Sequence, residues 1–152
     1  MAKQTKAKIP TNTRRASLLV ADEILYSLGG KVYLQGMYLN DISINADQVV
    51  APQLVFMFIF ETEIENSFTS ITLEITLPGS EAVKAPITIA QPVIPHQDRT
   101  HIMYRLPLLL SAPILRPGRI EARIIHDRGE ILANAIWITK APHVAANVEK
   151  LD

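Results

Sequence analysis

The stretch Gln53–Ile64, QLVFMFIFETEI, decides the expected fold of this chain. Side chains of an extended strand alternate between two faces, so its three phenylalanines share one face and the aliphatic residues between them share the other. A strand that is apolar on both faces is usually covered on both sides. The stretch therefore predicts a central strand of a β-protein, and one of its faces is a candidate for a subunit contact. The phenylalanines, Phe56, Phe58 and Phe60, are expected in the core or at a protein interface and are the candidate interaction residues of this strand.

The same stretch is too short to cross a bilayer as a helix. Glu61 and Glu63 close its apolar run, whereas a spanning helix needs about 20 apolar residues. The N-terminus does not resemble a secretory signal, because Asp22 and Glu23 interrupt the apolar run that follows the basic residues. The chain has no cysteine, which excludes disulfides, thiolate metal sites and cysteine nucleophiles. These features predict a cytoplasmic protein with no membrane partner.

Length and composition predict one folded domain. The chain has 152 residues, of which 48% are hydrophobic, so it is too apolar for disorder and long enough for a sizeable core. We expect a basic tail over residues 1–15, a β-sandwich domain over 16–140 and a C-terminal tail over 141–152. The apolar content at balanced charge also leaves apolar surface for a partner.

Charge is balanced overall, with 15 basic and 15 acidic residues, but it is unevenly placed. Residues 1–15 carry five basic side chains and no acid, so the remaining chain holds 10 basic and 15 acidic residues. Such a tail is usually solvated, but it can also contact a nucleic acid or an acidic protein surface, including a neighbouring copy. It lacks the aromatic residues that stack on bases, so we favour a protein contact over nucleic acid. Its basic residues are Lys3, Lys6, Lys8, Arg14 and Arg15.

Residues 16–39 are expected to form a β-hairpin. A three-residue loop over Leu28–Gly30 places Gly30 where a left-handed residue is needed. This register pairs Tyr26 with Val32, Ile24 with Leu34, Asp22 with Gly36 and Val20 with Tyr38, and gathers the apolar side chains on one core-facing row. Asp22 is then an acid on that row, and we expect backbone N–H groups to satisfy its carboxylate.

This hairpin resembles the opening of a family of uncharacterised bacterial β-sandwich domains. In that family a strand with an acid leads through a Gly-Gly turn into a strand of the form Lys-x-x-Leu-x-Gly. Pro117-Gly118 followed by an alternating strand, a turn and a last strand is similar too, so the resemblance covers roughly residues 16–139. It implies the sandwich fold and no known activity. The matching residues of the hairpin are Asp22, Gly29, Gly30, Lys31, Leu34 and Gly36.

The rest of the chain predicts further short strands. Residues 69–77 alternate cleanly and predict a half-buried strand, while 40–52 is expected to be a connection and 111–118 a loop. Residues 83–94 and 102–110 contain prolines, which favours edge or bulged strands. About eight strands without a long amphipathic helix predict an antiparallel, immunoglobulin-like or related β-sandwich, with a small β-barrel as the alternative.

The last hairpin, over residues 119–139, has two possible registers. A two-residue loop at Arg128-Gly129 sets Trp137 opposite Ile120, whereas a three-residue loop ending at Gly129 sets Ile136 there. Trp137 is therefore either a core or a surface aromatic residue, and core is the more common place.

Catalytic motifs are absent from the sequence: there is no phosphate-binding loop, dinucleotide fingerprint, nucleophile elbow or zinc-binding helix motif. The best local candidates for a metal site are His96, Asp98 and His101, in the polar loop over residues 95–101. Their spacing is not diagnostic, so we predict no cofactor and no metal. His126 and Asp127 are expected at one end of the sandwich.

The sequence favours a non-enzymatic interaction or structural module that associates with itself or with another protein subunit. The apolar central strand and the acidic body with a basic tail motivate this hypothesis. One alternative is a sandwich that binds a small ligand or carbohydrate through the loop over residues 95–101. A metal-dependent enzyme is the third and least favoured hypothesis.

Overall fold

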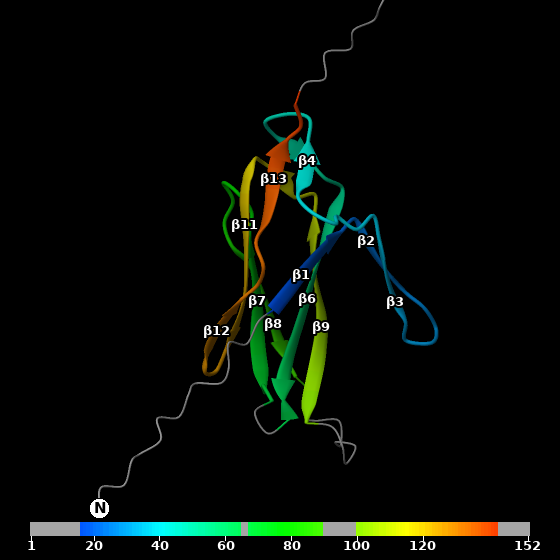
Figure 1. Ribbon diagram of the computed structural model, residues 1–152, viewed down its shortest axis with the longest axis vertical. Coiled ribbons are helices and arrows are strands. Elements are labelled where there is room, and N and C mark those ends of the chain that lie inside the picture. Colours follow the sequence, from blue (N-terminus) through cyan, green and yellow to red (C-terminus); the bar gives the residue numbers. More distant parts are fainter. Residues whose placement is uncertain (1–15, 65–66, 90–99, 143–152) are drawn as a thin grey trace, which may run out of the picture.

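The computed structural model describes residues 16–64, 67–89 and 100–142, and nearly all of its regular structure is β (Figure 1). The predicted all-β class is therefore confirmed. One sheet has the strand order β1-β6-β9, and these strands are all antiparallel. Its strands are β1 (Ala16–Ala21), β6 (Gln53–Glu63) and β9 (His101–Ser111).

The second sheet has the order β4-β13-β11-β7-β8, with β12 also pairing to β11. One hydrophobic core joins the inner faces of both sheets, so the fold is a two-layer β structure. The strands of this sheet are β4 (Ile42–Ile44), β7 (Ser70–Thr76), β8 (Val83–Thr88), β11 (Gly118–His126), β12 (Gly129–Leu132) and β13 (Ile136–Lys140). Two short pairs complete the fold: β5 (Val49–Val50) with β10 (Ile114–Leu115), and β2 (Glu23–Tyr26) with β3 (Val32–Gln35).

The central position of β6 agrees with its sequence. It lies between β1 and β9, and its inner face carries Leu54 and the three phenylalanines into the core. On its other face Val55 and Met57 are also buried, whereas Ile59 is half-buried. The strand is thus covered along most of both faces, as its apolar pattern predicts.

The predicted edge strands and the alternating strand are also confirmed where the structure describes them. β8 pairs only with β7, and β9 pairs only with β6, so Pro86 and Pro107 each lie in an edge strand. β7 buries Ile71, Leu73 and Ile75 on its inner face.

Two segments expected to be irregular contain strands. Residues 40–52 hold β4 and β5, and residues 111–118 hold β10. β4 runs parallel to β13, so the sheet is not purely antiparallel. These strands have only two or three residues each, which is too short for an alternating pattern to be visible in the sequence.

Trp137 is a surface residue and is 49% exposed, although a core position is more common for tryptophan. The turn of the last hairpin is Asp127-Arg128, because His126 pairs with Gly129, so neither predicted loop is correct. One extra residue between β12 and β13 then shifts the register, and Ile136 comes to lie opposite Ile120. Ile136 therefore enters the core, and Trp137 points outward opposite Arg119.

Candidate interaction surface

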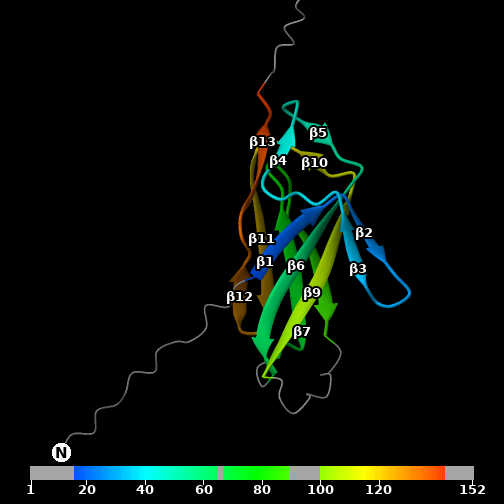
Figure 2. The ribbon, with the colours of Figure 1, turned by 45° about the vertical axis from the view of Figure 1, so that its right-hand side comes forward.

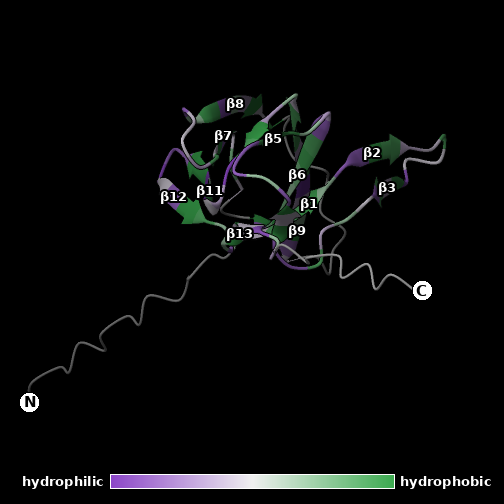
Figure 3. Ribbon diagram, turned by 90° about the horizontal axis from the view of Figure 1, so that it is seen from above, coloured by the Kyte–Doolittle hydropathy of each residue, from purple (hydrophilic) through white to green (hydrophobic). Residues whose placement is uncertain are grey.

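The hairpin β2–β3 stands away from the body of the molecule in three views (Figures 1, 2 and 3). Its register is the predicted one: Tyr26 pairs with Val32, Ile24 with Leu34, and Val20 bridges to Tyr38. Gly30 has a φ of 71°, which confirms the left-handed position in the turn. We call residues 23–35 the arm.

Both strands of the hairpin bend at Asp22 and Gly36, and this kink directs the arm away from the body. β1 ends at Ala21, next to Asp22, and on the opposite strand Gly36 has a φ of 67°. A Cβ atom on Gly36 would collide with the carboxylate of Asp22. The close approach and the left-handed backbone both require glycine here, so both strands bend at this level.

A hydrogen bond fixes this kink. The Tyr38 hydroxyl donates to Oδ1 of Asp22 over 2.9 Å, and the Gln53 side chain donates to the Asp22 carbonyl oxygen. Burial, together with this hydrogen bond, raises the pKa of Tyr38 to about 12. Asp22 is exposed, so the expected core-facing acid held by backbone N–H groups is wrong: a tyrosine hydroxyl holds it instead.

The arm exposes large apolar side chains on both of its faces, where the sequence predicted one core-facing row. Ile24 and Leu34 are half-buried near its base, but the remaining large apolar side chains of the arm are all exposed. Such a concentration on one projecting element is typical of a protein contact. The exposed fractions are Leu25 43%, Tyr26 65%, Leu28 111%, Val32 47% and Tyr33 53%.

The outward-facing side of β6 and β9 continues this apolar surface. β2 lies against β6, so the base of the arm adjoins this side of the sheet. Further from the arm base, Met103 and Leu109 are each 48% exposed, and Ile59 and Pro107 are half-buried. We call these four residues the outer face.

Charged side chains lie around the arm and the outer face. Within the part of the chain that the structure describes, Glu23 and Lys31 on the arm and Glu61 and Arg105 on the outward side of β6 and β9 form no ion pair. All four are exposed, so they are available to a partner of complementary charge.

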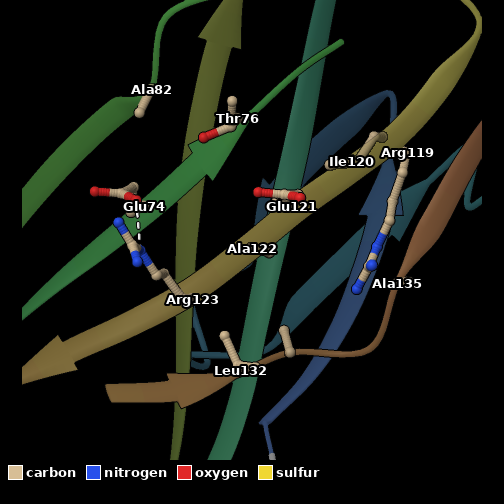
Figure 4. A pocket seen from close by; sticks show the side chains of 11 residues that line it. Glu74, Thr76, Ala82, Arg119, Ile120, Glu121, Ala122, Arg123, Leu132 and Ala135 are labelled. Carbon is tan, nitrogen blue, oxygen red and sulfur yellow. Dashed lines mark hydrogen bonds and ion pairs between the residues drawn. The ribbon is translucent and has the colours of Figure 1, made fainter. Parts of the chain in front are cut away.

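The outward side of the second sheet carries a depression of about 330 Å³ that is lined by both charged and apolar residues (Figure 4). It opens where the register shifts between β12 and β13. Nε of Arg123 donates to Glu74 over 2.6 Å, and its Nη1 donates to Glu130 over 3.0 Å. The depression is lined by Glu74, Thr76, Ala82, Arg119, Ile120, Glu121, Ala122, Arg123, Leu132, Ala133 and Ala135.

Glu74 is the buried acid of this depression. Its side chain is 5% exposed, although the sequence placed it on a wet strand face. The hydrogen bond from Arg123 lowers the pKa of Glu74 against the opposing effect of burial, and Lys84 lies 3.2 Å from the second carboxylate oxygen. Glu74, Arg123, Lys84 and Glu130 thus form one ion network along the depression, and Arg119 and Glu121 line the same depression.

The residues predicted from sequence fall in other places. Phe56, Phe58 and Phe60 are at most 2% exposed and belong to the core, so their side chains do not reach the surface for an intermolecular contact. His101 is exposed, and its Nδ1 lies 2.8 Å from the Thr100 hydroxyl. The other residues of that metal hypothesis and the tails lie outside the described residues: His96, Asp98, Lys3, Lys6, Lys8, Arg14 and Arg15.

No cluster of three metal-binding side chains occurs among residues 16–64, 67–89 and 100–142. The predicted ligand-binding loop over residues 95–101 is described only from Thr100 onward, so that alternative stays a prediction. His126 lies at the end of the sandwich as expected, with its ring 4.6 Å from that of Phe68.

Sequence reasoning missed the arm as a surface. The signal was present: the short strands beside the Gly-Gly turn are apolar at consecutive positions, which places apolar side chains on both faces of a two-stranded element. Such an element cannot bury both faces against one core.

The described part of the chain contains no helix that is long and apolar enough to span a membrane. No protein-family model matches the chain, and comparison with curated proteins also finds no match.

Proposed function

We propose that this chain is a structural module that binds a protein subunit through the arm and the outer face. The observation that carries this proposal is the projection of five large apolar side chains into water on a hairpin that, among the residues that the structure describes, packs on the body at its base. A two-stranded hairpin is marginally stable in water by itself. Contact with a partner would stabilise it by removing apolar surface from water.

The chemistry of the surface favours binding over catalysis. Its exposed side chains are aliphatic and aromatic, and such groups act through burial and packing rather than through proton transfer or nucleophilic attack. Tyr26 and Tyr33 suit a contact especially well, because tyrosine supplies a large apolar area with few rotatable bonds. The lack of cysteine supports placing such a module in the cytoplasm.

The test is the native size of the chain in an extract of its source cells. We expect the wild-type chain to elute in a species larger than the monomer of 16.9 kDa. The double variant Tyr26→Ser/Tyr33→Ser should elute as a monomer, because it removes the two exposed aromatic side chains of the arm without touching the core. Leu132→Ser is the matched control, since Leu132 is 66% exposed on a different sheet. Identical elution of all three proteins would refute the proposal.

A further inference from the structure

We propose that the partner is a second copy of this chain, and that the arm of each copy lies on the outer face of the other. This inference rests on the proposed function and names its partner. The same chain carries both halves of the contact: a projecting apolar arm and exposed apolar residues on the sheet β1-β6-β9. A two-fold axis can bring each half against its counterpart, which is the usual geometry of a homodimer.

The arm and the outer face lie close enough together to contact one partner at the same time. The base of the arm meets the body where Asp22 adjoins β6, and β2 lies against that strand. The outer face begins on the same sheet, with Leu109 directly opposite Val55 in the register of β6 and β9. The arm base and Leu109 therefore flank the same part of β6, where Val55 is buried, and a symmetric contact would use the arm together with the exposed residues of β9.

The area available approaches what a stable dimer needs. Scaled by roughly 150–200 Å² for a fully exposed large side chain, the exposed fractions of one face of the arm, of Leu28 at its tip, and of Met103 and Leu109 amount to about 550 Å². A standard interface buries about 800 Å² on each partner. Arm exchange uses both halves on both copies, so the apolar side chains alone supply most of this area.

Charge complementarity supports a partner of the same sequence. The arm carries one acid and one base, Glu23 and Lys31. On the outward side of the sheet, Glu61 lies opposite Met103, and Arg105 lies opposite Ile59 between Met103 and Pro107. Each charge on the arm therefore has an opposite charge on this side of a second copy. Their lack of ion pairs within the described chain leaves them free to align that contact.

Light scattering on the purified full-length chain gives the first test. We expect a mass twice the monomer's 16.9 kDa, and a monomer for Tyr26→Ser/Tyr33→Ser. A wild-type chain that stays monomeric at about 100-fold higher concentration would overturn the second copy as partner. If the extract still shows a larger species that depends on the arm, the proposed function stands and only this inference fails.

Cross-linking between single-cysteine variants tests the arrangement, because the natural chain contains no cysteine. Tyr26→Cys and Tyr33→Cys sample the two faces of the arm, and each is mixed with Leu109→Cys and treated with a short bismaleimide. We expect at least one arm variant to form a mixed cross-linked dimer with Leu109→Cys. The matched control is Leu132→Cys, on the other sheet, which should not cross-link to the arm. A dimer in which the arm cross-links no faster to Leu109→Cys than to Leu132→Cys would overturn arm exchange.

Discussion

Asn134 closes the gap between the two sheets, and its removal should measurably weaken the fold. It lies in the one-residue register shift between β12 and β13. Its side-chain oxygen accepts a hydrogen bond from the Leu18 N–H, and its side-chain nitrogen donates to the Leu18 carbonyl oxygen over 3.4 Å. Next to it, Ala133 bridges to Ala16. The side-chain amide of Asn134 thus pairs with the backbone of Leu18 in β1 as a neighbouring strand would.

The expected loss for Asn134→Ala follows from these two bonds. A hydrogen bond contributes about 0.5–1.5 kcal/mol net, and a buried backbone group left without a partner costs about 1–3 kcal/mol. Because Asn134 itself is exposed, water can reach part of the vacated edge. We therefore expect a loss of about 1–2 kcal/mol in the free energy of unfolding. For a chain of this size that lowers Tm by about 2–8 °C.

Urea and thermal unfolding followed by circular dichroism measure this loss. Asn134→Asp keeps the acceptor for the Leu18 N–H but loses the donor, so it should lose less stability than Asn134→Ala. Asn45→Ala is the matched control, because Asn45 is exposed and makes no hydrogen bond to another described side chain or backbone group. If Asn134→Ala has the same urea and thermal unfolding midpoints as Asn45→Ala and the wild type, the amide does not hold the sheets together.

Three further predictions concern the kink and the ion network. Gly36→Ala should cost about 1–3 kcal/mol, because a left-handed non-glycine residue is strained and its Cβ meets Asp22, whereas Gly29→Ala, with no close contact, should unfold almost as the wild type does. The pKa of Glu74 is lowered in the fold, so this residue contributes stability above the unfolded pKa of about 4.5, and that stability is lost as pH falls through the folded pKa. In urea unfolding, Glu74→Gln should therefore weaken the dependence of the free energy of unfolding on acidic pH. Tyr38 has a raised pKa, so its contribution is lost as pH rises from about 10 to about 12, and Tyr38→Phe should remove the highest step of an ultraviolet titration.

Each of these has an outcome that contradicts it. Equal stability of Gly36→Ala and Gly29→Ala would mean that the kink tolerates a side chain. An unchanged acidic slope in Glu74→Gln would mean that other carboxylates dominate acid unfolding. A titration of Tyr38→Phe that keeps the step near pH 12 would assign that step to another tyrosine.

The sequence predicts the longer strands. β6 follows from an apolar run on both faces, β7 follows from a period-two pattern, and the edge positions of β8 and β9 follow from proline, which cannot donate to a ladder. The register of the first hairpin follows from Gly30, because a left-handed residue fixes the loop. In these cases local chemistry and the tertiary fold agree.

Features that depend on long-range geometry escape the sequence pattern. An apolar row shows which residues share a face, but not whether that face meets the core. The kink at Asp22 and Gly36 therefore turned an expected core hairpin into an arm. The outward position of Trp137 depends on one extra residue after β12, and no periodic pattern reports such a shift.

The phenylalanines show the same limit for the candidate site. Their face of β6 was assigned a subunit contact as one alternative, but the second sheet of the same chain covers it. The contact surface proposed instead comes from the arm, whose apolar residues are fewer and lie on shorter strands. The arm differs from the phenylalanine face of β6 in its exposure to water rather than in its apolar content.

Hydrogen–deuterium exchange of the full-length chain at low and high concentration tests the central claim most directly. If the arm is buried against a second copy, the amides of β2 and β3 should become more protected as concentration rises, while those of β8, an edge strand outside the proposed contact, should not change. Exchange of residues 23–35 that is equally fast at every concentration would contradict the account, because the arm would then remain in water.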